Sequence, residues 1–66
     1  MEKMKVLEVK FSEWHKCFIL LCTNGEKTLY APAVQSLSAR EGDMVLVLND
    51  KGLKYRGHHA VAIMPA

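Results

Sequence analysis

The sequence lacks the features that mark membrane proteins and disulfide-rich secreted domains. Its longest apolar run, residues 17–22, is far shorter than the about 20 residues that a membrane-spanning helix needs. No basic start followed by an apolar segment indicates a signal peptide. Two cysteines are too few for a disulfide framework. We therefore expect an intracellular, cytoplasmic chain with no membrane partner.

Metal-binding and catalytic patterns are lacking as well. Cys17 and Cys22 lie five residues apart in one predicted strand and so point to opposite faces, and the neighbouring His58 and His59 also diverge. Neither pair has the spacing of a zinc site. The carboxylates fall in predicted turns, and no Ser-His-Asp or Cys-His set can be assembled from them. We predict no metal, no cofactor and no enzymatic activity.

A strong charge of one sign is also missing. Nine Lys and Arg against seven Asp and Glu give a net charge of +2, and there is no dense basic run. This balance allows a nucleic-acid partner without requiring one. Half of the residues are hydrophobic, which is too apolar for a disordered chain, and the length allows one small domain over residues 1–66. What remains is a compact binding module or a small interaction protein.

What the sequence does have is a series of short strand-like segments separated by turns. Composition and alternation predict strands at residues 3–11, 15–23, 27–30, 44–48 and 59–64. Asn24-Gly25 predicts a hairpin with a type I′ turn, in which both central residues take positive φ. Pro32 ends the third strand, residues 33–40 are suited to one helical turn, and residues 54–57 form a basic loop. This pattern predicts an all-β fold, a small five-stranded antiparallel OB-type barrel.

Four segments resemble the cold-shock domain family. Residues 9–21 are similar, without gaps, to the first motif of that family, and residues 28–34 fall where it has its second motif. Residues 37–42 resemble the entry to its fourth strand and residues 57–63 its closing segment. TRAM-type barrels of similar size match less well. The resemblance covers nearly the whole chain and implies a cold-shock-like barrel that presents stacking aromatics to single-stranded RNA or DNA.

Departures from the family pattern reduce the number of aromatic side chains on this platform. Cys17 and Ile19 replace both glycines of the first motif, and Leu20 replaces its second phenylalanine. The resemblance and the local charge together imply a nucleic-acid site made of Lys10, Phe11, Trp14, Lys16, Phe18, Thr28, Tyr30, Lys54 and Arg56. Its aromatic side chains would stack on bases and its basic side chains would contact phosphates. With so small a net charge, we expect weak, regulatory binding.

Strand alternation predicts which of these residues share a face. Lys16, Phe18 and Leu20 lie on one side of the second strand, and the family geometry puts that side outside. Tyr30, with Thr28, is expected on the same side as Phe18.

Each of these residues also has a structural interpretation that the sequence leaves open. Phe18 and Tyr30 are equally suited to packing, and Trp14 to a lid over the barrel. Strict alternation buries Phe11, whereas the resemblance exposes it. Scattered lysines commonly form nothing more than a solvated face.

The fourth predicted strand points to a different function. It is apolar on both faces, so that if Val45 and Val47 point inward, Met44, Leu46 and Leu48 point outward. An exposed apolar stripe usually marks a protein interface. The alternative prediction is therefore a protein-interaction module, or a small inhibitor or regulator, that uses this stripe to form a homodimer or to bind another protein.

Overall fold

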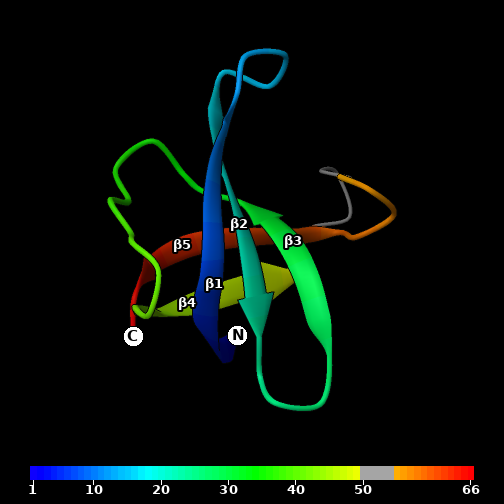
Figure 1. Ribbon diagram of the computed structural model, residues 1–66, viewed down its shortest axis with the longest axis vertical. Coiled ribbons are helices and arrows are strands. Elements are labelled where there is room, and N and C mark those ends of the chain that lie inside the picture. The colour runs from blue at the N-terminus through cyan, green and yellow to red at the C-terminus, as the bar shows by residue number, and fades with distance from the viewer. Residues whose placement is uncertain (50–54) are drawn as a thin grey trace.

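The fold is a single sheet of five antiparallel strands, seen here in a computed structural model that describes residues 1–49 and 55–66 (Figure 1). The strands are β1 (Glu2–Ser12), β2 (Cys17–Thr23), β3 (Thr28–Pro32), β4 (Met44–Asn49) and β5 (Ala60–Pro65). Their order in the sheet is β3-β2-β1-β4-β5. The predicted all-β class is confirmed, and this small sheet is consistent with an OB-type barrel.

The two edges of the sheet meet at one point. Ala33 and Ala62 form an isolated parallel bridge, and the backbone N–H of Val34 donates a hydrogen bond to the Ala62 carbonyl at 2.9 Å. Alanine side chains let the backbones of β3 and β5 approach each other here. The sheet therefore curls into a barrel-like shape, although no continuous ladder of hydrogen bonds closes it.

Small and medium apolar side chains fill the inside of the curl. The buried cluster consists of Met4, Val6, Leu20, Cys22, Ala31, Ala33, Leu37, Val45, Val47, Ala60 and Ala62. In β4, Val45 and Val47 are 1% and 5% exposed, as alternation predicted. The outward direction of their neighbours Met44, Leu46 and Leu48 follows from the same alternation.

The β2–β3 hairpin is confirmed, but its turn is not of type I′. Thr23 pairs with Thr28, so four residues form the loop. The side-chain oxygen of Asn24 accepts hydrogen bonds from the backbone N–H groups of Glu26 and Lys27, both at 2.9 Å. Asn24 thus organises the loop through its side chain, and the positive φ of 95° belongs to Gly25 alone in this turn.

The segment between β3 and β4 also differs from the prediction. Residues 33–40 contain a single turn, closed by a hydrogen bond from the Leu37 N–H to the Val34 carbonyl at 3.0 Å, in place of the expected helical turn. Leu37 is 7% exposed and joins the buried cluster, so its burial draws this segment across one end of the barrel. Across the described residues, no helix is long and apolar enough to cross a membrane.

Candidate functional site

The two faces of β2 are the reverse of the prediction. Leu20 is 1% exposed and lies opposite Val9 and Ala31, in the core. Ile19 and Leu21 point to the outer face. The expectation that Leu20 belongs to an exposed platform is therefore wrong, because its side chain helps to fill the curl of the sheet.

Phe18 and Tyr30 lie on opposite sides of the sheet. Tyr30 pairs with Leu21, whereas Phe18 pairs with Phe11. Directly opposed residues in antiparallel strands point to the same face, so Tyr30 belongs to the outer face and Phe18 to the core side. Thr28 shares the outer face with Tyr30. The predicted platform that combined Phe18 with Thr28 and Tyr30 is therefore divided between two surfaces.

Phe11 and Phe18 are exposed because the β1–β2 hairpin extends past the end of the core (Figure 1). Their exposed fractions are 54% and 50%, and their rings meet edge to face with centroids 5.1 Å apart. They border a groove of about 480 Å³ whose lining includes Leu20, Ala33 and Leu37. Phe11 is thus exposed, as the family resemblance implied, while remaining on the core side of β1.

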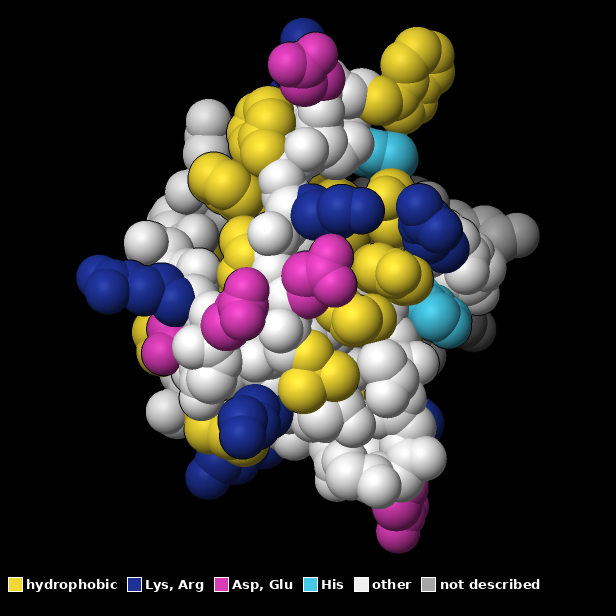
Figure 2. Space-filling view, in the orientation of Figure 1, with side chains coloured by type: hydrophobic (Ala, Val, Ile, Leu, Met, Phe, Trp, Pro, Cys, Tyr) yellow, Lys and Arg dark blue, Asp and Glu magenta, His cyan; other side chains and the backbone are white. Residues whose placement is uncertain are grey.

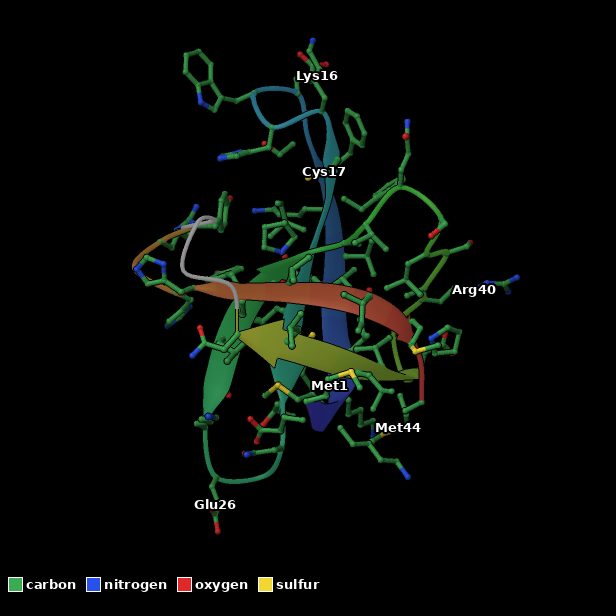
Figure 3. All side chains as sticks on the ribbon, turned by 180° about the vertical axis from the view of Figure 1, so that it is seen from behind. Met1, Lys16, Cys17, Glu26, Arg40 and Met44 are labelled. Atoms are coloured by element: carbon green, nitrogen blue, oxygen red, sulfur yellow. The ribbon has the colours of Figure 1, made fainter. Side chains whose placement is uncertain are left out.

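The tip of the β1–β2 hairpin carries Trp14 and Lys16 into solvent. Trp14 is 89% exposed, so it is not a lid over the core. The hydroxyl of Ser12 lies 2.9 Å from Nδ1 of His15 and accepts a hydrogen bond from the His15 backbone N–H at 3.2 Å. Lys16 has a positive φ of 57° and projects away from the barrel (Figure 3).

Residues 55–58 form a second tight turn, which the sequence did not reveal. Tyr55 and His58 exchange two backbone hydrogen bonds, of 3.0 and 2.9 Å. The two central residues, Arg56 and Gly57, have φ values of 50° and 83°, the positive pair that type I′ turns require. The basic loop predicted over residues 54–57 is therefore an ordered turn from Tyr55 onward, and Lys54 lies outside the described residues.

This turn packs on the outer face of β3 and builds an aromatic cluster. Ring centroids lie 5.0 Å apart for His15 and Tyr55, and 5.6 Å apart for Tyr30 and Tyr55. His58 stacks on Tyr30 at 6.3 Å, and its Nδ1 accepts a hydrogen bond from the Tyr30 backbone N–H at 3.1 Å. The guanidinium of Arg56 lies over both tyrosine rings, 5.1 Å from Tyr30 and 5.7 Å from Tyr55. We call these five residues the outer aromatic cluster.

The cluster contains a cationic group and shares its face with a buried apolar residue. Arg56 Nε donates a long hydrogen bond of 3.5 Å to the Tyr55 hydroxyl, which raises the pKa of the guanidinium above its usual value. Ile19 is 3% exposed although it points outward, so the outer face is covered at this point. Lys10 pairs with Ile19 and Glu8 with Leu21, which places both charges on the same face. Hydrophobic, basic and histidine side chains gather there (Figure 2).

Sequence reasoning identified Tyr30, Arg56 and Lys10 but missed three contributors, His15, Tyr55 and His58. The available signal was Gly57 alone, because glycine at the second central position is typical of a two-residue hairpin turn, whereas arginine is not a residue that favours the positive φ of the first position. The contact of this turn with β3 is a tertiary feature, and no local pattern encodes it.

The predicted interface residues lie on a different outer face. Met44 and Leu48 are 37% and 40% exposed, and Leu46 is half-buried beside Met64 of β5, which is 47% exposed. We call these four residues the apolar stripe. On β1, Lys3 pairs with Leu46 and Lys5 with Met44, so the stripe has a basic border.

The described side chains at these surfaces can be compared with the needs of known kinds of site. Within residues 1–49 and 55–66, no three His, Cys, Asp or Glu side chains come together in a group that could hold a metal ion. The outer aromatic cluster offers rings for stacking and a guanidinium for anions. No family model, curated protein or solved structure matches this chain.

Proposed function

We propose that the chain binds single-stranded RNA or DNA, weakly, at the outer aromatic cluster. The observation that carries the proposal is the meeting of three regions: β3 with Tyr30, the β1–β2 loop with His15, and the 55–58 turn with Tyr55 and Arg56. In OB-type barrels, the face of strands two and three and the loops after strands one and four bind oligonucleotides. This part of the argument is an analogy of fold, and the residues themselves supply the rest.

The side chains of the cluster suit the two chemical parts of a nucleic acid. A guanidinium that lies on tyrosine rings keeps its outer edge available for a phosphate. Outside the cluster, Trp14 precedes His15 in the chain and is an exposed ring of the kind that stacks on bases with little regard to sequence. Lys10 adds a second positive charge on the same face. The net charge of +2 leaves little long-range attraction, so we expect micromolar or weaker affinity.

A fluorescence titration tests this proposal. Trp14, which is 89% exposed, should change its emission when pyrimidine RNA or DNA of about six or seven bases is added, and the affinity should fall between about 50 and 200 mM salt. Comparing the RNA and DNA arms shows which of the two is preferred. Emission that stays constant with both oligonucleotides at millimolar concentration would contradict the proposal.

Matched variants locate the site. Arg56→Gln should weaken binding about tenfold, because it removes the stacked guanidinium. Arg40→Gln removes the same charge on the other side of the barrel and should leave affinity within about twofold (Figure 3). Phe18→Ala, on the core side, should also leave it within about twofold. A large loss with Phe18→Ala and none with Arg56→Gln would move the site to the groove beside Phe11.

A second candidate function rests on the apolar stripe. We propose that it associates with a protein, and that self-association is the form to test first. Sedimentation at tens of micromolar should show a dimer, which corresponds to a dissociation constant of about 10⁻⁵ M. Leu46→Lys should abolish that dimer, because it places a charge in the centre of the stripe beside Lys3. If the wild type is a monomer at this concentration, self-association is refuted and only a different protein remains as the partner.

A further inference from the structure

His58 is the single described side chain that ties the 55–58 turn to the edge of β3 by a hydrogen bond. Its Nδ1 accepts a hydrogen bond of 3.1 Å from the backbone N–H of Tyr30, at a half-buried position. A backbone N–H can only donate, so Nδ1 must carry a free lone pair. The hydrogen bond therefore requires a neutral imidazole with its proton on Nε2.

Protonation of His58 turns this attraction into repulsion. An imidazolium carries N–H groups on both nitrogens, so two donors would then face each other between His58 and Tyr30. The cluster depends on this tie, because Tyr55 and Arg56 reach Tyr30 from the same four-residue turn. We propose that neutral His58 is a latch that holds the outer aromatic cluster together and that acid pH opens it.

Among the described residues, neither the 55–58 turn nor Tyr30 of β3 brings a negative charge to His58. On its own turn, Arg56 is positive and Tyr55 is neutral, and Tyr30 contributes a neutral ring from β3. The other side of His58 lines a cleft of about 590 Å³ that also includes the Met1 end of the chain, Glu2, Lys27 and His59.

In that cleft, Glu2 is the described carboxylate that could balance an imidazolium. Its charge is already paired with Lys27 at 3.2 Å, and its side chain also accepts a hydrogen bond from Asn24. On the neighbouring outer face, Glu8 and Lys10 oppose each other in sign.

The latch gives the proposed function an unusual pH dependence. Acidification adds positive charge to His15, His58 and His59, which by electrostatics alone strengthens phosphate binding. If the latch assembles the cluster, affinity falls instead as the pH drops from 8 to 5.5, because Tyr55 and Arg56 leave their places on Tyr30. This inference rests on the proposed function for its ligand, but the latch itself is measurable without any ligand.

The first test follows the Tyr30 amide by NMR in the ligand-free protein. Between pH 8 and 5.5, its hydrogen-exchange protection factor should fall about fivefold, together with a change in its proton shift. His58→Asn keeps an acceptor close to the Nδ1 position and cannot titrate, so the protection should persist at both pH values. His58→Phe keeps a ring without an acceptor, so the protection should be low at both.

His59→Asn is the matched control. It removes a neighbouring, exposed histidine and should leave the titration of the Tyr30 amide unchanged. If the Tyr30 amide does not respond to pH, or if His59→Asn abolishes its response while His58→Phe does not, the latch is wrong.

The second test measures the binding of a labelled eight-base pyrimidine oligonucleotide by anisotropy at constant ionic strength. Wild type should bind about fivefold more weakly at pH 5.5 than at pH 8, whereas His58→Asn should bind more tightly at pH 5.5. Tighter binding of wild type in acid would overturn the latch and keep the proposed function. A titrating Tyr30 amide with no binding at either pH would keep the latch and refute the proposed function.

Discussion

Two outer faces of the sheet carry apolar side chains, and the chain treats them differently. On β2, the outward Ile19 is 3% exposed, on the face that also carries Tyr30 and the outer aromatic cluster. On β4 and β5, the outward Met44, Leu48 and Met64 are 37%, 40% and 47% exposed. The same sequence signal, a strand that is apolar on both sides, thus has two outcomes. The difference between the two faces is how far their outward apolar side chains are buried.

This comparison changes how each apolar face should be interpreted. A buried outward side chain such as Ile19 is already withdrawn from water and needs no partner to shield it. The outward side chains of β4 and β5 remain exposed to water or to another molecule. Substitutions that place charge on each face test the distinction directly.

The largest effect should come from a charge placed at the buried outward position of β2. Ile19→Asp buries a carboxylate with no partner and should cost about 3 kcal/mol of the free energy of unfolding. Leu46→Asp on the apolar stripe should cost less than about 1 kcal/mol, because its side chain reaches water. Urea unfolding at low protein concentration measures both. Equal losses of unfolding free energy would mean that Ile19 and Leu46 are equally buried.

An intermediate effect should come from the buried Cys22 thiol in the core. Burial raises the pKa of the Cys22 thiol from 9.0 to about 11. A raised pKa stabilises the fold fully below pH 9, where the thiol is neutral in both states, and this stabilisation is lost as the pH rises through 11. The loss should reach about 2–3 kcal/mol.

Cys22→Ala serves as the reference for this measurement. Its unfolding free energy should fall less steeply between pH 8 and 11 than that of wild type, because lysines and tyrosines titrate in both proteins. Parallel curves would show that the thiol does not face the core.

The smallest effect should come from the exposed contacts of Glu2 with Asn24 and Lys27. Hydrogen bonding from Asn24 and from Lys27 lowers the pKa of Glu2, so its contribution is present at neutral pH and is lost as the pH falls through the lowered pKa. Glu2→Gln should therefore lower the thermal midpoint slightly at pH 7 and not at all near pH 2. Glu41→Gln, in an exposed loop, is the control, and an equal shift with it would mean that these contacts contribute nothing.

Much of the fold was predictable because it depends on local chemistry. Alternation in β4 separated Val45 and Val47 from their neighbours, the structure shows that this pair points inward, and Asn24-Gly25 marked a hairpin. The prediction failed on the pairing across the hairpin. Any loop with an even number of residues, two or the observed four, sets Tyr30 opposite an odd-numbered residue of β2 and therefore on the face away from Phe18.

The site was predictable only in part, for a related reason. Lys10, Tyr30 and Arg56, which the sequence assigned to one nucleic-acid site, lie on or over one face of the sheet. Leu20 was misassigned because a family pattern replaced the evidence of burial. His58 could not be found in advance. Its role depends on the approach of a turn to a strand 28 residues earlier in the chain.

The hydrogen bond to Tyr30 also has a consequence for how copies of this chain behave at high concentration. Exposed edge strands invite other chains to add to the sheet, because their outward N–H and C=O groups are free. On the edge of β3, Tyr30 already donates its outward N–H to His58, and Pro32, two residues on, has no N–H to donate. Two successive outward positions thus offer no donor to an incoming strand. This part of the β3 edge is therefore a poor template for edge-to-edge aggregation.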